Sequence, residues 1–300
     1  MLTAREFRAL VASLDRTGRW ADEPERGALN FLTRDATLGG LGTVTEGRVV
    51  SCADRAAAHR VIRPDGGDAA LTTTTDGALD WLAVNEEVRY QQHGPAAMTH
   101  LDSLGHFFYG GRGYGGASPE TVDDDGVTAN DVRPAGSGLV GRGLLLDLPR
   151  AIGAPYVPPD RQVTLPEVQR WLAETGAEPQ SGDLLFVRTG RPQSPPPEPG
   201  DFPLVGTLDL GCAAWMRDKE FSVVLSDAGL DSPTPIVEDV STPWHVLLLV
   251  ALGVFLVDGA DLEELSVACA DRGRATFLAV LAALPLPGAT ASPVNPLAVL

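Results

Sequence analysis

Residues 93–106 read His93-Gly-Pro-Ala-Ala-Met-Thr-His100-Leu-Asp102-Ser-Leu-Gly-His106 and contain three of the five histidines of the chain. His100 and Asp102 are two residues apart, so in a β-strand their side chains project from the same face. An imidazole and a carboxylate on one face form half of a divalent-metal site. His106 follows four residues later and either shares that face or begins the next turn. This spacing predicts a metal or catalytic site.

The chemistry of such a site assigns a role to His106. An imidazole has a pKa near neutrality, so beside an activated water it is well placed as a general base. A divalent metal there would lower the pKa of the water and polarise a substrate carbonyl. The alternative interpretation is that these polar groups only cap loops and satisfy hydrogen bonds.

Outside this segment, strand and helix patterns alternate in the second half of the chain. The sequence predicts strands at residues 143–148, 182–188 and 221–226 and helices at residues 3–15, 164–176 and 209–219. Residues 244–257 read as a buried helix or helix–strand mixture, residues 288–300 as mostly extended, and residues 117–137 as an exposed acidic excursion. The alternation favours one α/β domain with a mixed sheet.

Composition excludes several classes of function. The chain of 300 residues carries 23 basic and 40 acidic side chains, a net charge of -17, whereas nucleic acids and anionic membranes both require a basic face. The longest apolar run, Val246 to Val257, is twelve residues, and a membrane span needs about 20. Cys52, Cys212 and Cys269 are far apart, which is typical of buried thiols in a reducing compartment. We therefore expect a cytoplasmic protein that binds neither nucleic acid nor a membrane.

Several strings of the chain resemble one known family. Thr99-His100-Leu101-Asp102-Ser103-Leu104-Gly105-His106, followed by Phe107-Phe108-Tyr109-Gly110-Gly111, resembles the core motif of the putative cyclase family, which includes bacterial kynurenine formamidases and isatin hydrolases. Further strings resemble that family in the same order: Gly141 to Asp147, Gly182 to Gly190, Pro243-Trp244-His245 and Gly288 to Pro296. The resemblance runs from about residue 40 to the end, and the length resembles that of a longer bacterial branch.

This resemblance implies a fold and an activity. The fold would be a single α/β domain over residues 1–300, with a mixed, barrel-like sheet flanked by helices in a swivelling β/β/α arrangement. Residues 1–40 would be an N-terminal helical extension. The protein would be a homodimer or homotetramer that uses zinc or manganese. It would hydrolyse a carbon–nitrogen bond in a small amide, formamide or lactam.

The resemblance also implies roles for individual residues. His100 and Asp102 would be metal ligands, and His106 would be the catalytic histidine. His245 and Asp258 would complete the second side of the site as further catalytic groups, with Asp258 one methylene shorter than the glutamate of the family pattern.

One expected metal ligand is missing from the sequence. The family pattern HxxxHxDxxxH places its first histidine at position 96, where this chain has Ala96. His93 is the candidate replacement. In a regular strand, seven residues of separation would point His93 and His100 to opposite faces, so Gly94-Pro95 must break the strand for His93 to take that role.

Two further interpretations stay open. With Ala96 in place of a ligand, His100, Asp102, His106 and His245 could serve a metal-independent cyclase or dehydratase of secondary metabolism as acid–base groups. Alternatively, the chain could be a non-catalytic member of the family that binds a small ligand or a partner protein.

Single residues outside the motif also carry two interpretations. His245 could be a core histidine satisfied by a backbone carbonyl. Asp227, at a strand end, either faces a pocket or caps a turn. Trp81 and Tyr90 either line an aromatic pocket or belong to the core.

Overall fold

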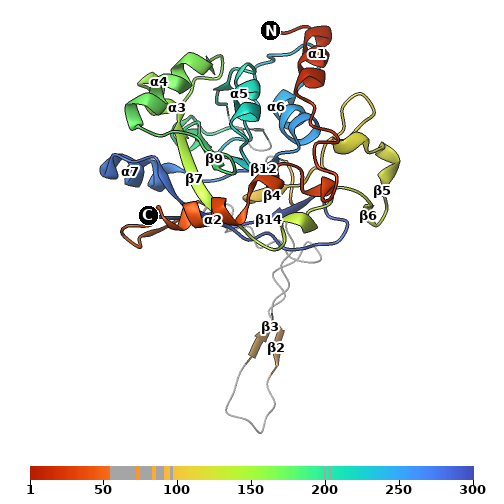
Figure 1. Cartoon of the computed structure of the whole chain (residues 1–300), viewed down its shortest axis with the longest axis horizontal. Coiled ribbons are helices and arrows are strands. Elements are labelled where there is room, and N and C mark those ends of the chain that lie inside the picture. The colour runs from red at the N-terminus through yellow and green to blue at the C-terminus, as the bar shows by residue number, and fades with distance from the viewer. Residues whose placement is uncertain (55–71, 75–82, 86–90, 95–96, 199–200, 203) are drawn as a thin grey trace.

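Four parallel strands form the centre of a nine-stranded sheet (Figure 1). The computed structural model describes residues 1–54, 72–74, 83–85, 91–94, 97–198, 201–202 and 204–300. The strands of the sheet follow the order β1-β15-β13-β7-β9-β11-β12-β4-β14. Their bounds are β1 Val49–Ser51, β4 His100–Asp102, β7 Leu139–Asp147, β9 Leu184–Arg188, β11 Val223–Ser226, β12 Phe255–Asp258, β13 Thr276–Leu281, β14 Ala291–Pro293 and β15 Leu297–Val299.

The parallel centre comes from strand–helix–strand connections. β7, β9, β11 and β12 pair in parallel, and their strands are buried along nearly their whole length, as in sheets covered on both faces. The α-helices of the described residues are α1 Ala4–Leu14, α2 Arg34–Leu41, α3 Leu148–Ile152, α4 Leu165–Thr175, α5 Cys212–Asp218, α6 Pro243–His245 and α7 Glu263–Arg272. The strands predicted at 143–148, 182–188 and 221–226 are therefore confirmed as β7, β9 and β11.

Two helices begin where local hydrogen bonding predicts. Thr3 and Glu6 form a complete capping box at the start of α1, and Thr164 and Glu167 form one at the start of α4. The helix expected at residues 209–219 is shorter, Cys212–Asp218, and Asp209 lies in a turn between it and strand β10 (Thr207–Leu208), which pairs with β8 (Gln162–Val163).

The apolar run after Trp244 is both helix and strand. α6 continues into a π-helical segment, Val246–Leu252, and the chain then enters β12. Every residue of the π-helical segment is buried. The succession of helix and strand confirms the predicted buried helix–strand mixture. π-helical turns often occur at functional sites, and this one begins directly after His245.

Antiparallel strands complete both sides of the sheet. β13, β15 and β1 extend it beyond β7, while β4 and β14 extend it beyond β12. The tail predicted to be extended supplies β14 and β15. Besides the β8–β10 pair, the described residues form two further short pairs, β2 (Thr72–Thr74) with β3 (Ala83–Asn85) and β5 (Val122–Asp123) with β6 (Gly126–Val127).

The excursion at residues 117–137 is only partly exposed, which corrects the sequence-based expectation. Asn130, Asp131 and Val132 are buried. Backbone hydrogen bonds join this segment to the C-terminal tail, from Val127 N to Gly288 O (2.9 Å) and from Val132 N to Ala289 O (2.9 Å). The acidic tip stays exposed while its base packs on the tail.

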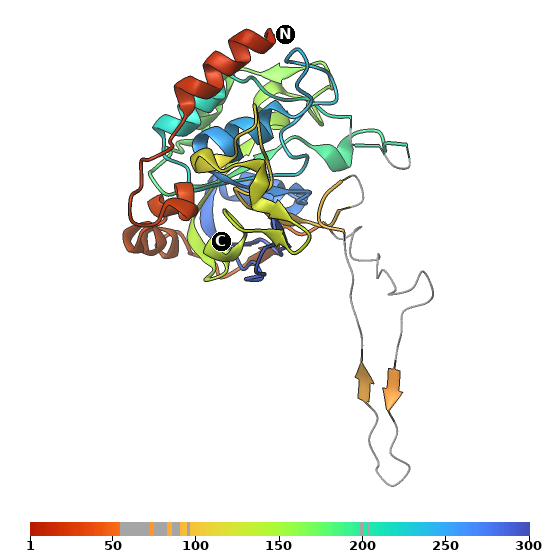
Figure 2. The same cartoon turned by 90° about the vertical axis from the view of Figure 1, so that its right-hand side faces the viewer.

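Helices lie on both sides of the curled sheet. Figures 1 and 2 show α1, α5 and α6 together on one side and α2 on the other. α2 lies close against β7, where a Cβ on Gly40 would come within 2.4 Å of the Gly141 carbonyl carbon. Residues 1–40 contribute Phe7, Leu14 and Leu29 to the core. The N-terminal extension over residues 1–40 stays a prediction. The assembly of the chain into a homodimer or homotetramer also stays a prediction.

Candidate metal centre

Strand β4 brings the two central residues of the predicted site together. It lies between β12 and β14, with His100 opposite Asp258 and Asp102 opposite Leu256 of β12. The Nε2 atom of His100 lies 3.4 Å from Oδ1 of Asp102. The shared face expected from the two-residue spacing is thus confirmed, and the neighbouring strand adds Asp258 to it.

The Asp102 carboxylate is the centre of the cluster. Its side chain is 1% exposed, and four imidazoles surround it. The ring nitrogens lie 3.3 Å (His93 Nδ1), 3.4 Å (His100 Nε2), 3.8 Å (His245 Nε2) and 4.0 Å (His106 Nε2) from a carboxylate oxygen. Among the described residues, neither oxygen of Asp102 has a hydrogen-bond partner.

A buried carboxylate without donors is costly, because it has lost its hydration without replacement. A cation bound between the oxygens and the surrounding nitrogens would remove that cost. Ligand atoms of His93, His100 and Asp102 lie within 4.8 Å of one another, as do those of Asp102, His106 and His245. Imidazole and carboxylate donors at this spacing fit a divalent metal ion.

The outer nitrogen of His100 determines which ring atom faces Asp102. His100 Nδ1 lies 2.7 Å from the Met98 carbonyl oxygen, which can only accept, so Nδ1 carries the hydrogen. The Nε2 lone pair is then directed toward Asp102. A backbone carbonyl behind a metal-binding histidine fixes the tautomer in this way.

His93 reaches the cluster from outside β4. Gly94, with φ of 98°, follows it directly, so the chain leaves the extended path between His93 and His100. His93 Nε2 lies 3.2 Å from Thr290 Oγ1, which leaves Nδ1 to face Asp102. Pro95 and Ala96 lie outside the described residues. His93 therefore occupies a position from which it could replace the missing histidine ligand.

His106 lies in the turn that follows β4. Its backbone N donates to Ser103 O (3.1 Å), and its ring stacks on that of His93 with centroids 3.8 Å apart and planes 4° apart. Within the described part of the chain, no hydrogen bond to the His106 ring is found, and its side chain is 20% exposed. A partly accessible imidazole with a free nitrogen is suited to accept a proton.

His245 and Asp258 form the second side of the cluster. His245 Nε2 lies 3.3 Å from Asp258 Oδ2. Its Nδ1 lies 2.5 Å from Oδ2 of Asp231, so this histidine is satisfied by a carboxylate and not by the backbone carbonyl expected for a core histidine. Sequence reasoning missed Asp231, because it lies fourteen residues from His245 in a proline-containing loop without a motif.

Burial and the neighbouring charges shift the pKa values of His106 and His245 in opposite directions. Burial lowers the pKa of His106 to about 4, although the nearby Asp102 acts in the opposite direction. Burial also disfavours the charged form of His245, but Asp258 and Asp231 hold its pKa well above the ordinary value. Burial likewise opposes the charge on Asp102, yet the histidines around it, His93 first, keep the pKa of Asp102 below its ordinary value.

We predict that His106 remains neutral in the metal-free protein down to about pH 4. In an unfolded chain a histidine titrates near 6.5, so the contribution of His106 to folding stability is complete above pH 6.5 and is lost as the pH falls toward 4. Histidine ring resonances followed by NMR during an acid titration measure this, with His106→Gln identifying the resonance. Titration of His106 near pH 6.5 would contradict the prediction.

Asp227 has a structural role in this arrangement. It is fully buried and accepts hydrogen bonds from the backbone and hydroxyl of Thr189 and from the backbone of Gly190 and Arg191. This carboxylate fixes the loop after β9, as the turn-capping interpretation expects. Trp81 and Tyr90 lie outside the described residues.

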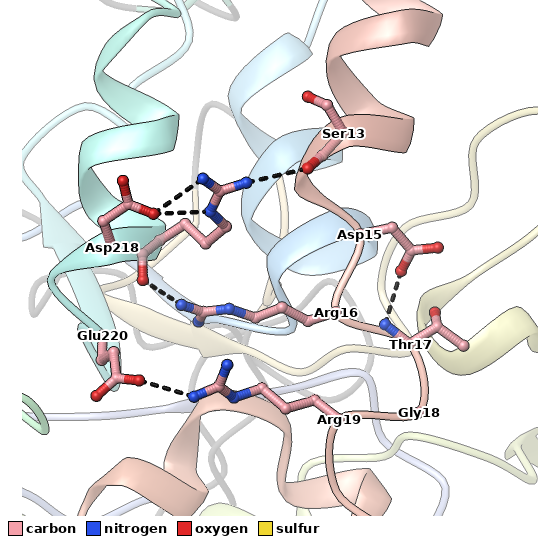
Figure 3. Close-up of a pocket in the computed structure, with 9 residues that line it drawn as sticks. Ser13, Asp15, Arg16, Thr17, Gly18, Arg19, Asp218 and Glu220 are labelled. Carbon is pink, nitrogen blue, oxygen red and sulfur yellow. Dashed lines mark hydrogen bonds and ion pairs between the residues drawn. The ribbon is translucent and has the colours of Figure 1, made fainter.

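A cavity of about 590 Å³ lies elsewhere, at the ends of α1 and α5 (Figure 3). It is lined by Ser13, Asp15, Arg16, Thr17, Gly18, Arg19, Arg217, Asp218 and Glu220. Arg19 pairs with Glu220 at 2.7 Å, and Arg217 donates to Ser13 O at 3.0 Å. These contacts tie the loop after α1 to the end of α5, and the lining includes none of the predicted site residues.

Comparison with known proteins identifies one family and its fold. A family model described as "Putative cyclase" matches residues 42–230. No curated protein matches the chain. A solved structure described as a novel cyclase is 24% identical, with 97% of this chain and 99% of that chain covered and a TM-score of 0.80.

Two isatin hydrolase structures share the fold at lower similarity. Isatin hydrolase A from Labrenzia aggregata, bound to benzyl benzoate, is 18% identical, with 84% of this chain and 93% of that chain covered and a TM-score of 0.51. An isatin hydrolase bound to the product analogue thioisatinate is 18% identical, with 89% and 99% covered and a TM-score of 0.54. The mixed α/β fold with a curled, half-barrel sheet is therefore confirmed.

No membrane-spanning helix is found within the described ranges, because none of their helices is both long and apolar enough to cross a bilayer.

Proposed function

Since this chain belongs to the putative cyclase family, we propose that it is a metal-dependent hydrolase that cleaves the carbon–nitrogen bond of a small amide, formamide or lactam. The family match covers β4, with His100 and Asp102, as well as His106. The observation that carries the proposal is the buried Asp102 carboxylate, whose oxygens lack hydrogen-bond donors among the described residues while four imidazoles surround it.

In this proposal His93, His100 and Asp102 hold the metal. Their ligand atoms lie within 4.8 Å of one another, and the hydrogen bond from His100 Nδ1 to Met98 O directs the Nε2 lone pair of His100 toward Asp102. The contact of His93 Nε2 with Thr290 leaves its Nδ1 facing the same carboxylate. Imidazole and carboxylate ligands suit either zinc or manganese. When bound, the cation supplies Lewis acidity toward a carbonyl oxygen and makes water a better nucleophile.

The remaining histidines divide the proton transfers of the hydrolysis. His106 accepts one proton from the attacking water as the water oxygen bonds to the carbonyl carbon, because its ring makes no hydrogen bond to the described residues, is partly accessible and is held neutral. His245, beside Asp258, donates a proton to the nitrogen when the carbon–nitrogen bond breaks. The products are a carboxylate and an amine, joined in one molecule when the substrate is a lactam.

A substrate panel tests this proposal. Purified protein is assayed on an N-formyl arylamine, a simple aryl amide and a five-membered lactam, before and after chelation and after zinc or manganese is added back. We expect hydrolysis of at least one compound that is lost on chelation and restored by metal. Full activity in chelator would instead support the metal-independent acid–base reaction, and no turnover of any panel member by metal-loaded protein would favour a ligand-binding role.

His93→Ala is predicted to weaken metal binding by at least about tenfold, because it removes one of three proposed ligands. Adding Ala96→His to this variant tests the substitution of one ligand for the other, since the family pattern has histidine at 96. We expect the second change to restore affinity, measured by metal titration of the apo protein. Unchanged affinity in His93→Ala would remove His93 from the ligand set.

A further inference from the structure

The turn after β11 has an uncommon backbone. Gly229 and Leu230 both have left-handed conformations, with φ of 66° and 62°. Such a conformation is unfavourable for leucine and persists only where the surroundings hold it. Leu230 is fully buried, and its carbonyl accepts a hydrogen bond from the Thr207 hydroxyl. The surrounding core thus holds Leu230 in place, and this fixes the position of the next residue, Asp231.

Asp231 makes three contacts with one short helix. Its Oδ1 accepts from Trp244 N at 2.8 Å, and its Oδ2 accepts from His245 N at 3.3 Å and from His245 Nδ1 at 2.5 Å. The same carboxylate therefore caps the beginning of α6 and holds the imidazole. The ring and the backbone of His245 cannot move independently of Asp231.

The contact determines which nitrogen of His245 reaches the cluster. A carboxylate accepts hydrogen bonds, so it keeps a hydrogen on Nδ1 and directs Nε2 away from itself. Nε2 then lies 3.3 Å from Asp258 Oδ2 and 3.8 Å from Asp102 Oδ2. We propose that Asp231 is a positioning residue that presents Nε2 of His245 to the reaction site. The inference rests on the proposed function for the reaction that His245 serves.

The same turn also leaves room for the Asp258 carboxylate, because position 229 is glycine. A Cβ at position 229 would lie 2.7 Å from Asp258 Oδ2, so only glycine leaves that carboxylate its place beside His245. Two consecutive left-handed residues therefore bring Asp231 under one edge of the imidazole and clear space for Asp258 at the other.

Asp231→Asn separates positioning from helix capping. Asparagine caps a helix about as well as aspartate, so a purely structural role would survive the change. Its amide, however, can donate to Nδ1, which leaves the ring with a hydrogen on Nε2 alone. The matched control is Asp209→Asn, since Asp209 accepts from Gly211 N (2.9 Å) just before α5 and contacts no histidine among the described residues.

The readouts are the ring nitrogen resonances of His245 in metal-free protein and kcat of the metal-loaded enzyme. In Asp231→Asn we expect Nδ1 to lose its hydrogen, and kcat to fall by at least about 100-fold with little change in thermal unfolding. A neutral ring without a carboxylate behind it donates the hydrogen of Nε2 far less readily than an imidazolium does, and it is no longer held in the orientation that the reaction needs. Asp209→Asn is expected to match the wild type in both.

Two results would overturn the inference. One is a His245 ring in Asp231→Asn that keeps its hydrogen on Nδ1, and the other is an altered ring with unchanged kcat. If the ring changes as expected but the wild-type protein hydrolyses no member of the amide panel, the proposed function fails while the orienting contact stands.

Discussion

Asp102→Asn lowers the affinity for divalent metal by at least about 100-fold and removes the stabilisation that metal gives the fold. Asp102 is the proposed ligand that all four imidazoles face, and an uncharged amide is a much poorer ligand than a carboxylate. A ligand present at 100 times its Kd stabilises the folded state by about 2.7 kcal/mol. Thermal unfolding with and without added zinc or manganese measures this difference.

The control for that variant is Asp183→Asn. Asp183 is also buried, but it pairs with Arg142 at 2.7 Å. Breaking a buried ion pair is costly, so Asp183→Asn should lower the unfolding temperature with and without metal while keeping the metal-induced increase. An undiminished metal-induced increase in Asp102→Asn would rule out a site centred on this carboxylate.

His106→Gln keeps the metal but lowers kcat by roughly 10²–10⁴-fold, the usual contribution of a general base. His106 is outside the proposed ligand set, and its ring has no hydrogen-bond partner in the described part of the chain, so its loss should leave the cluster assembled. Metal content and thermal unfolding are expected to equal those of the wild type. The readout is the pH dependence of kcat on a substrate found in the amide panel.

The pH profile distinguishes a lost base from a disturbed site. If His106 accepts the proton, the acidic limb of the wild-type profile disappears in His106→Gln and the residual rate becomes less dependent on pH. Unchanged turnover in this variant on a confirmed substrate would exclude His106 as the base.

Local rules were enough to predict much of the fold from sequence. The capping boxes at Thr3 and Thr164 depend only on residues three positions apart, and both are present. The apolar run Leu184 to Val187, after the turn at Gly182-Asp183, predicted β9, because a strand buried on both faces needs continuous apolar side chains. The spacing of His100 and Asp102 likewise placed both on one face of β4.

Contacts between distant segments could not be predicted in the same way. Nothing near Asp231 in the sequence indicates that it holds His245, since the contact depends on the left-handed turn at Leu230 and on the packing of α6. The role of Asp227 was equally undetermined, because its partners Thr189 to Arg191 follow a different strand. The sequence offered His93 only as a candidate to replace the histidine missing at position 96. The folded chain places His93 Nδ1 3.3 Å from an Asp102 oxygen.

In the proposed function the Asp102 cluster is a metal site despite Ala96. The most direct test is elemental analysis of the metal bound per chain, on protein purified without chelator and without a histidine tag. We predict near-stoichiometric zinc or manganese in the wild type and a strongly reduced content in Asp102→Asn. A wild-type protein that holds no metal and takes up none on dialysis would contradict the account.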